Sequence, residues 1–432
     1  MKVKRVADLM NFRAASFNRL AKLESSRDPL LIDRGEGAHL FESSGRRFLD
    51  CQGNSAVIGH SHPIYVKNMV DQLGKLQTNA RFVYDPFERM IKKILSTFPE
   101  EMCYVTFANS GAEANDTAVQ MARSFAGHQG VVAVEGAYHG MLSSTLDLSS
   151  LDSKAPQKAS KDLTLLSNPC QYRGKFAGKE DSSQLYAQEF EEKTRNVERP
   201  IFIAEMMMNL GGLILPRKDY FRKIAEKISK RNGIFIADET SSGLGVLGSL
   251  WASQHFEVTP DIVTIGKNLG NGFPVAAVVC SQKVMDAYAK DHKEFFSTYS
   301  GSPLACVSSE TVLNIIESEK LLANSAEQGQ FLLEALKPAL GLPVVGDLRG
   351  LGLRVAVEFV KDKQSKAPHP LAAELAVQKC REQNLLVGLK GIHSNVLAIE
   401  PPIMISRSDA QNIAEIVNKA CKDTSKELAA SS

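Results

Sequence analysis

Short apolar runs alternate with amphipathic stretches through the middle of the chain. The apolar runs have the length and composition of buried strands. Between two of them, residues 217–233 place Ile224 and Ile228 on one helical face, and Gly233 follows the last turn. Because apolar strands that alternate with helices form parallel sheets covered on both faces, this pattern predicts an α/β fold. The predicted strands are 103–109, 130–136, 201–207, 233–239, 261–266 and 275–280, and a further helix is predicted over 112–127.

This pattern is interrupted in two regions. Residues 150–200 are rich in Ser, Lys, Pro and Gly, which predicts an extended excursion over the surface. After residue 320 the chain predicts strands at 352–361 and 395–402, a helix over 370–384 and a last helix at the end. The C-terminal region is therefore predicted to be a smaller α+β unit beside the main sheet.

Composition excludes several classes of partner. The chain has 432 residues, of which 44% are hydrophobic and 23% are charged, as in an ordinary globular protein of two or three packed units. Its 51 Lys and Arg residues nearly balance its 49 Asp and Glu residues, so neither nucleic acid nor a membrane surface is expected as a partner. No apolar run approaches the roughly 20 residues that a membrane span needs.

The cysteines and the N-terminal residues bear on the compartment. None of the seven cysteines forms a CxxC pair, which predicts reduced thiols and a cytoplasmic protein. Residues 1–17 are amphipathic and basic, but they lack the uninterrupted apolar stretch of a secretory signal. A mitochondrial presequence is therefore the open alternative.

The stretch "NSGAEAND" (109–116) is the first candidate site. A strand ends here, Ser110 and two small residues follow, and a helix begins. Backbone N–H groups at a helix start, together with a hydroxyl, suit a phosphate. The alternative is a plain capping box between Ser110 and Glu113. The two interpretations are compatible.

The second and third candidates follow later strands. "AYHG" (137–140) puts Tyr138 where a ring could stack on a planar cofactor, although a packing tyrosine is as good an explanation. Asp238 follows three apolar residues at the end of a predicted central strand, where a carboxylate needs a partner. Because no His or Cys residues surround it with ligand spacing, a metal is not expected, and a cationic ring nitrogen is the better partner.

The fourth candidate is the lysine in "DIVTIGKNLGNGFP" (261–274). By itself Lys267 fits a solvated lysine at a strand end. It lies one strand–helix–strand step after Asp238, in a chain that also offers a phosphate site and a stacking ring. Together these features predict a site for pyridoxal phosphate, with a lysine to form a Schiff base and an acid for the ring nitrogen.

These stretches carry a resemblance to a known family over nearly the whole chain. The sequence resembles the class III aminotransferases, which are pyridoxal-phosphate enzymes of fold type I. Within the family it is most similar to the branch that holds alanine–glyoxylate aminotransferase 2 and the ethanolamine-phosphate and phosphohydroxylysine phospho-lyases. The matching stretches include "DCQGNSAVIGHSHP" (50–63), "FANSGAEANDTAVQMAR" (107–123), "GIFIADE" (233–239), "DIVTIGKNLGNGFPVAAVV" (261–279) and "FSTYSGSPLAC" (296–306).

The resemblance implies an architecture and an assembly. It implies a large domain over 51–319, with a mostly parallel seven-stranded sheet flanked by helices. The small α+β domain would combine 1–50 with 320–432. It also implies a homodimer with shared active sites, because Thr298 matches a threonine that reaches the phosphate of the neighbouring subunit's cofactor.

The resemblance further assigns roles to single residues. Catalytic roles fall to Lys267 as the Schiff-base lysine, Asp238 as the partner of the ring nitrogen and Glu205 as the acid on the substrate side. The cofactor-binding residues would be Ser110, Gly111, Ala112, Tyr138, His139, Asp238, Ser241, Lys267 and Thr298.

Three positions depart from the family pattern. Ser241 stands where a Gln usually lies near the cofactor's phenolic oxygen, and Val246 replaces an Arg. Ala398 stands where an Arg or Lys usually precedes the Pro-Pro pair, and such an Arg often binds a substrate carboxylate. Arg81 or Arg173 could bind the carboxylate instead.

The shared residues leave the reaction open. A small amine or amino acid is the expected substrate, and transamination is the commonest outcome in the family. Elimination of phosphate from a phosphorylated amine is the second hypothesis, and racemisation of an amino acid is a third. The departures also permit a non-catalytic protein that binds pyridoxal phosphate, although retention of Lys267, Asp238, Ser110 and Thr298 argues against it.

Overall fold

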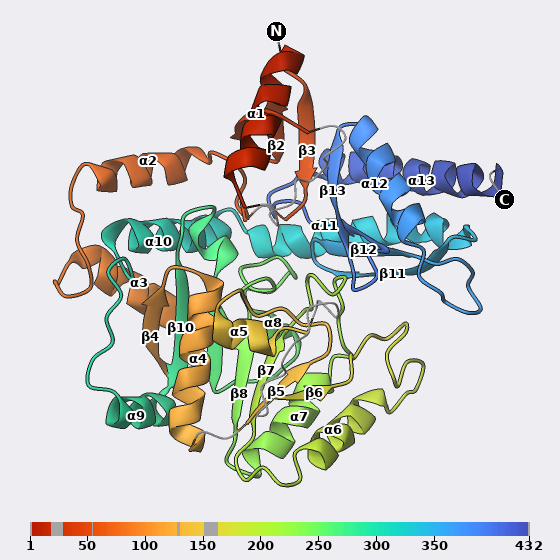
Figure 1. The fold of residues 1–432 in the computed structure, drawn as a ribbon. Helices are drawn as coiled ribbons and strands as arrows, with labels where there is room; N and C mark the ends of the chain where they lie inside the picture. The colour runs from red at the N-terminus through yellow and green to blue at the C-terminus, as the bar shows by residue number, and fades with distance from the viewer. Residues whose placement is uncertain (1, 19–28, 54, 128–129, 151–162, 431–432) are drawn as a thin grey trace.

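The computed structural model describes residues 2–18, 29–53, 55–127, 130–150 and 163–430, and it contains two seven-stranded sheets (Figure 1). The first sheet occupies the lower half of the view and the second occupies the upper right. Strands of the first sheet are β4 (Met102–Ala108), β5 (Val131–Val134), β6 (Leu163–Leu166), β7 (Ile201–Glu205), β8 (Ile234–Asp238), β9 (Ile262–Ile265) and β10 (Ala276–Ser281).

The first sheet has the order β4-β10-β9-β8-β7-β5-β6. The pairs from β9 to β6 are parallel, and β10 is antiparallel to both of its neighbours. The prediction of a mostly parallel seven-stranded sheet is therefore confirmed. The continuous apolar runs have the expected cause, because side chains of β8 alternate between two cores: Ile234 and Ile236 join one, Phe235 and Ala237 the other.

Helices cover both faces of this sheet and connect it to the second sheet. The described helices are α1 (Lys2–Ser16), α2 (Pro63–Leu73), α3 (Asp85–Leu95), α4 (Gly111–Ala126), α5 (Ser143–Leu148), α6 (Ser182–Lys193), α7 (Tyr220–Ser229), α8 (Ala252–His255), α9 (Gln282–Asp291), α10 (Pro303–Ser318), α11 (Leu321–Leu336), α12 (Pro370–Glu382) and α13 (Arg407–Ala430), with 3₁₀ turns η1 (Lys267–Gly270) and η2 (Lys337–Gly341). Within the described residues, no helix is long and apolar enough to cross a membrane.

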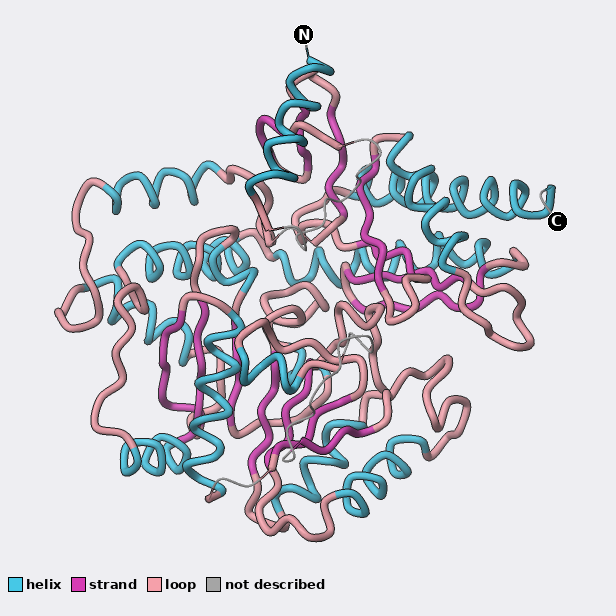
Figure 2. Tube along the Cα trace, in the orientation of Figure 1, coloured by secondary structure: helices cyan, strands magenta, loops and turns pink. Residues whose placement is uncertain are grey.

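The second sheet combines the two ends of the chain: β3 lies beside β13 in Figure 1, and Figure 2 shows the strands of this sheet in magenta at the same place. Its order is β1-β2-β3-β13-β14-β12-β11, in which β3 pairs in parallel with β13. Since β3 is N-terminal and β13 is C-terminal, neither end of the chain completes this sheet alone. The strands are β1 (Ile32–Glu36), β2 (His39–Glu42), β3 (Arg47–Cys51), β11 (Val345–Leu351), β12 (Arg354–Phe359), β13 (Leu385–Lys390) and β14 (Val396–Ile399).

The prediction of an extended excursion over residues 150–200 was wrong for β6 and α6. β6 pairs in parallel with β5 at the edge of the large sheet. α6 packs beside α7 and buries Tyr186 and Phe190. The polar composition misled because half of the residues that α6 buries are polar: Ser182, Ser183 and Glu189. Residues 151–162 lie outside the described part of the chain.

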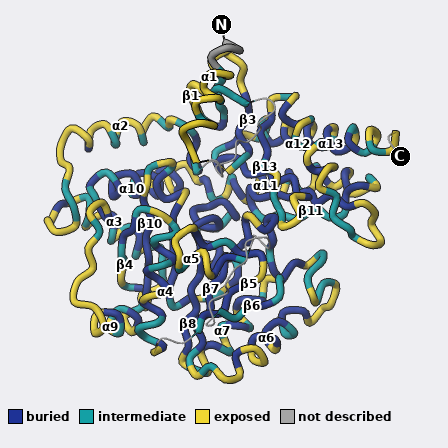
Figure 3. Tube along the Cα trace, in the orientation of Figure 1, coloured by how far each residue is buried: buried dark blue, intermediate teal, exposed yellow. Residues whose placement is uncertain are grey.

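Buried residues concentrate in the sheets and in the layer between them, whereas α1 and the outer faces of the helices are exposed (Figure 3). One close crossing in this layer brings α11 against the turn between β11 and β12. A Cβ atom added to Gly329 of α11 would lie 1.9 Å from the carbonyl oxygen of Gly352. Only glycine allows this approach.

We expect Gly329→Ala to destabilise the protein by about 1–3 kcal/mol, because the added methyl group overlaps the Gly352 carbonyl. In a helix without such a close contact, Gly→Ala would stabilise the protein, since Ala is the better helix former by about 1 kcal/mol. Denaturant unfolding measures the effect. Gly341→Ala is the matched control, because nothing lies within 4 Å of its added Cβ. Equal stability of the two variants would contradict the prediction.

Candidate active site

Three of the predicted residues lie at the ends of three neighbouring strands. Glu205 is the last residue of β7, Asp238 is the last residue of β8, and the two are direct partners in the sheet. Lys267 follows Gly266 just beyond β9. Because parallel strands end at the same edge of a sheet, two carboxylates and one amine converge there.

Asp238 is buried and accepts four hydrogen bonds. Nδ1 of His139 (2.8 Å) and Nδ2 of Asn115 (2.7 Å) donate to one oxygen. The backbone N–H (3.0 Å) and hydroxyl (2.6 Å) of Thr240 donate to the other. Burial by itself would raise the pKa of Asp238, but the hydrogen bond and charge of His139, together with the Thr240 hydroxyl, lower it below its ordinary value. This carboxylate is therefore held in the ionised form that a protonated ring nitrogen requires.

Two of these donors were missed in the sequence. Asn115 lies within the 109–116 stretch, on a helical face otherwise lined by buried alanines, and it also accepts a hydrogen bond from Thr264 (2.6 Å). Thr240 follows Asp238 by two residues, which is the spacing at which an Asp side chain accepts a bond from its own turn. Both signals were present, and a search for donors to a buried carboxylate would have found them.

Glu205 is equally buried but has a different environment. Its two oxygens accept hydrogen bonds from the backbone N–H groups of Tyr138 (2.8 Å) and Asn209 (3.1 Å). Burial raises the pKa of Glu205, and the neighbouring Asp238 carboxylate adds to the increase. The two strand-end carboxylates thus have pKa values shifted in opposite directions, a pattern typical of paired groups with separate acid–base roles.

Tyr138 and His139 lie in the loop after β5, which the bond from Tyr138 N–H to Glu205 holds against the sheet edge. His139 is buried, and one ring nitrogen is taken by Asp238. Its Nε2 has no hydrogen-bond partner among the described residues. The site therefore retains one buried polar atom that a bound group could satisfy.

The start of α4 matches the phosphate hypothesis in its chemistry. Ser110 caps the helix by accepting a bond from the Glu113 N–H (3.2 Å). The capping box is altered, because the Glu113 carboxylate accepts from the N–H of Asn109 (3.0 Å) instead of Ser110. The first N–H groups of a helix have no partner within it, and here they end beside the sheet edge.

Close backbone packing joins this helix start to the lysine loop. A Cβ atom on Gly111 would lie 2.9 Å from Cγ2 of Thr240, and one on Gly266 would lie 3.3 Å from Cα of Gly111. Gly140 has a positive φ of +133°, and its added Cβ would lie 2.5 Å from Cβ of Ala112. Larger side chains would fill this cradle, so the small residues are required by space.

Lys267 has a left-handed backbone with φ +41°, an unusual conformation that is common at functional sites. Its Nζ donates a hydrogen bond to the hydroxyl of Ser241. Ser241, which stands where the family usually has Gln, therefore contacts the lysine directly.

Thr298 lies in an exposed segment before α10. Its neighbour Ser297 accepts a hydrogen bond from Nδ2 of Asn109 (3.2 Å), so the segment lies beside the residue that precedes Ser110.

The two arginines considered for the substrate are engaged elsewhere. Arg81 is exposed, pairs with Glu294 (2.6 Å) and stacks on the ring of Phe296. Arg173 donates to Glu358 (2.7 Å) and to the carbonyl of Lys366 (2.8 Å). Neither arginine has a described contact with the strand-end carboxylates or Lys267.

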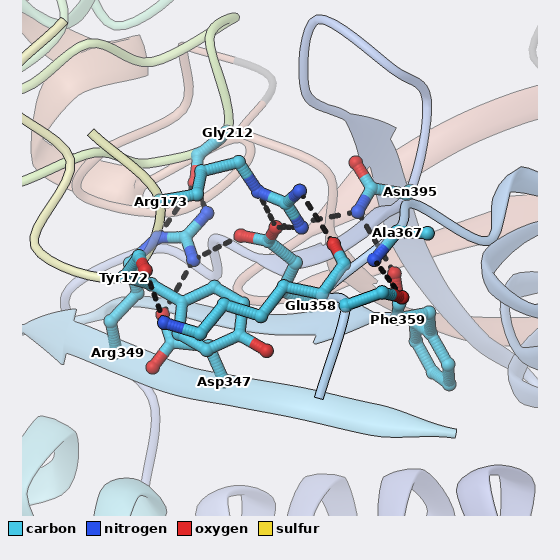
Figure 4. Close-up of polar contacts among 11 residues, drawn as sticks. Tyr172, Arg173, Gly212, Asp347, Arg349, Glu358, Phe359, Ala367 and Asn395 are labelled. Carbon is cyan, nitrogen blue, oxygen red and sulfur yellow. Dashed lines mark hydrogen bonds and ion pairs between the residues drawn. The ribbon is translucent and has the colours of Figure 1, made fainter. Parts of the chain in front are cut away.

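Arg173 belongs to a network between the two sheets (Figure 4). Arg349 donates to Asp347 (2.7 Å), to Glu358 and to the carbonyl of Gly212 (2.6 Å). Burial would raise the pKa of Glu358, but Arg349 and Arg173 hold it below its usual range. This network joins loops of the large sheet to β11 and β12, which is a structural role for Arg173.

The residues present fit pyridoxal phosphate. They supply an ionised acid, an amine at a strand end, a helix start with small residues and a buried ring nitrogen without a partner. The described residues contain no group of three or more His, Cys, Asp or Glu side chains that could hold a metal ion.

This sheet edge and its two-sheet architecture define a class of protein, the pyridoxal-phosphate-dependent enzymes of fold type I. The family model "Aminotransferase class-III" matches residues 22–421, and the chain belongs to that family. The enzymes of this family act on amines with pyridoxal phosphate as cofactor.

Two relatives carry different activities in their names. The chain is 36% identical over 399 residues to "Alanine--glyoxylate aminotransferase 2-like" of Drosophila melanogaster, covering 89% of this chain and 80% of the relative. It is 33% identical over 414 residues to "Ethanolamine-phosphate phospho-lyase homolog 1" of Caenorhabditis elegans, covering 91% and 88%. Other relatives, from Arabidopsis thaliana and Homo sapiens, are named mitochondrial.

The solved structures that resemble this chain also include both a phospholyase and transaminases. A phospholyase from Arthrobacter in complex with phosphoethanolamine has a TM-score of 0.88 at 26% identity, covering 96% of this chain and 99% of the other. The omega transaminase of Pseudomonas jessenii in complex with PMP has a TM-score of 0.90 at 26% identity, covering 97% and 98%.

The raised pKa of Glu205 predicts a pH-dependent effect of Glu205→Gln. Below the ordinary carboxyl pKa both proteins carry a neutral side chain there. As pH rises through the raised pKa, only the wild type must ionise a buried acid, so its stability relative to the variant should fall. The variant also loses one hydrogen bond from Tyr138 or Asn209, which lowers its stability by the same amount at every pH. The prediction therefore concerns how the stability difference changes with pH, not its size at one pH.

Thermal unfolding of the cofactor-loaded proteins between acid and neutral pH measures this slope. Glu226→Gln, which changes an exposed carboxylate, is the matched control, and the difference for Glu205→Gln should change more steeply with pH than the difference for the control. A flat difference for Glu205→Gln would contradict the prediction.

Proposed function

We propose that this protein is an aminotransferase that moves an amino group from a small amine or amino acid to a carbonyl acceptor, with Lys267 as its catalytic lysine. One observation carries the proposal: the Lys267 amine lies at the same sheet edge as an Asp238 carboxylate that four donors keep ionised. An amine and an ionised acid so placed match the needs of pyridoxal phosphate.

When bound, pyridoxal phosphate supplies a ring that accepts the electrons released at the substrate carbon next to the amino group. Asp238 would hold the proton on the ring nitrogen, and His139 and Asn115 would hold Asp238. The start of α4 would bind the phosphate. Lys267 would take the proton from the substrate carbon and pass it to the cofactor carbon that receives the amino group, and Ser241 would orient its Nζ.

We also propose a homodimer in which Thr298 contacts the partner's cofactor. Thr298 is exposed, and large apolar side chains near it are exposed as well: Tyr299 is 73% exposed and Phe296 is 45% exposed. Phe82 and Val83 in another exposed loop are 64% and 102% exposed, and Arg81 connects the two loops by stacking on Phe296. Apolar surface of this kind is typical of an interface between subunits.

The domain division at 1–50, 51–319 and 320–432 is part of the proposal, and the parallel pairing of β3 with β13 supports joining the two ends. We further propose a cytoplasmic location, with a mitochondrial one as the alternative that the names of two relatives favour.

A phospho-lyase is the second candidate. Position 398, where the family often has a cation that binds a substrate carboxylate, is an alanine and carries no charge. An enzyme that eliminates phosphate from an amine lacking a carboxylate would not need that charge. The relatives named as phospho-lyases support this candidate.

Lys267→Ala should abolish covalent attachment of the cofactor, since Nζ is the attacking atom. Wild type incubated with pyridoxal phosphate should gain the visible absorbance band of the lysine-bound cofactor, and the variant should not. A matched control is Lys283→Ala, which removes an exposed lysine that pairs with Asp261. A wild type that stays colourless would refute the enzyme proposal.

The reaction type follows from a two-arm assay of the loaded enzyme. One arm offers O-phosphoethanolamine and measures phosphate release. The other offers amine donors with pyruvate and measures alanine. We expect alanine from the second arm. Phosphate without alanine would refute the aminotransferase and establish the second candidate.

A further inference from the structure

Three small residues lie side by side on the face of the small sheet toward the site. Ala356, Ala398 and Gly388 lie opposite one another on three neighbouring strands, β12, β14 and β13, and we call them the small-residue patch. Since residues two apart share a face, Arg354 and Glu400 flank this patch on one side and Lys390 flanks it on the other. Three small residues in register thus have charged neighbours on the same face.

The side chain of Lys390 lies over the small-residue patch. Its Cε is 3.4 Å from the point where a Cβ on Gly388 would lie, and Cβ of Ala398 is 3.6 Å from that point. A long basic side chain at position 398 would start from this place. Lys390 therefore brings an ammonium group, from the paired strand, to the region that the alanine leaves without charge.

Two partners hold the Lys390 ammonium. It donates to Oδ1 of Asn209 and pairs with the carboxylate of Glu400. Nδ2 of Asn209 donates to Glu400 (2.7 Å), and the Asn209 backbone N–H donates to Glu205 (3.1 Å). The cluster is therefore linked by one residue to the acid at the end of β7.

The charges leave one cation in excess. Lys390 and Arg354 face the single carboxylate of Glu400. Arg354 is buried, and its Nε has no hydrogen-bond partner among the described residues, with Glu400 at 3.5 Å. Burial lowers the pKa of both cations, and the charge of Lys267 lowers that of Lys390 further. An anion would relieve both effects.

The cluster borders the edge at which Lys267 lies. Its members Glu400 and Arg354 line a small cavity together with Gly53 and with Asn268, the neighbour of Lys267. The Lys390 side chain is 12% exposed, whereas that of Glu400 is 1% exposed. An ammonium has three donors, and the described partners of Lys390 use two.

We propose that Lys390 binds an anionic group, carboxylate or phosphate, on the amine substrate, and that Asn209 and Glu400 position it. This inference rests on the proposed function, because it assigns the substrate side of the same site. It makes Lys390 a specificity residue in place of position 398, and it requires neither Arg81 nor Arg173.

Matched amines test the proposal. O-phosphoethanolamine is compared with ethanolamine, and L-alanine with ethylamine, so that each pair differs by one anionic group. Binding to the cofactor-loaded protein is followed by the change in visible absorbance, which needs no turnover. We expect Lys390→Met to weaken binding of one or both anionic amines about ten- to one-hundred-fold and to change binding of the neutral amines less than twofold. If only the O-phosphoethanolamine pair responds to Lys390→Met, the anionic group that Lys390 binds is a phosphate; if only the L-alanine pair responds, it is a carboxylate.

Two further variants separate recognition from folding. Lys390→Arg should retain most of the preference for the anionic amine. Lys390→Met with Ala398→Lys should restore part of it, because the cation returns from the paired strand to the same patch. Lys218→Met, which breaks an exposed ion pair with Glu257, should leave every binding constant unchanged.

Inorganic phosphate gives a readout independent of amine chemistry. With the cofactor site saturated, it should raise the unfolding midpoint of wild type more than that of Lys390→Met. If no amine is turned over but this difference persists, the proposed function fails and the Lys390 assignment stands. Equal losses for anionic and neutral amines in Lys390→Met, or a wild type without preference for the anionic amine, would overturn the assignment.

Discussion

The structure depends on keeping one carboxylate ionised in the middle of a buried sheet. A buried charge costs several kcal/mol unless hydrogen bonds compensate it. Asp238 obtains its four donors from three places: Asn115 on α4, His139 in the loop after β5, and Thr240 in its own turn. A shift of α4 or of the β5 loop would remove a donor from this charge. The positions of α4 and of His139 therefore follow from the requirement of Asp238.

The same principle connects the second sheet to the first. Glu358 on β12 is held by Arg173 and Arg349, and Glu400 beside β14 is held by Lys390 and Asn209. Each acid lies on the face of the small sheet that turns toward the large sheet. Charges buried between two sheets favour one relative arrangement, because any other leaves an acid or a cation without its partner. The network around Glu358 holds the two sheets together, and the network around Glu400 reaches the sheet edge where Glu205 lies.

The features that could be predicted from the sequence depend on residues that are adjacent in the chain, and the features that were missed depend on residues far apart in it. The apolar runs and the residues that follow them, Asp238 and Lys267 among them, were read correctly as strands and strand ends because a strand and its last residue are adjacent in the chain. The N-terminal strands β1–β3 were not predicted from the pattern, and only the family resemblance placed residues 1–50 with the C-terminal region, since the partner strand β13 lies more than 300 residues away. β6 was missed because a short edge strand leaves little periodic signal.

The departures from the family pattern show why a single position is a weak guide to substrate recognition. Ala398 suggested that the substrate side had lost its charge. In a sheet, however, neighbouring positions on paired strands face the same space, so a cation can reach the small-residue patch from β13 as well as from β14. The Lys390 side chain lies over Gly388, since a Cβ atom there would be in van der Waals contact with Cε of Lys390, at 3.4 Å. The glycine, the alanine and the lysine are therefore one feature, and only the strand register reveals it.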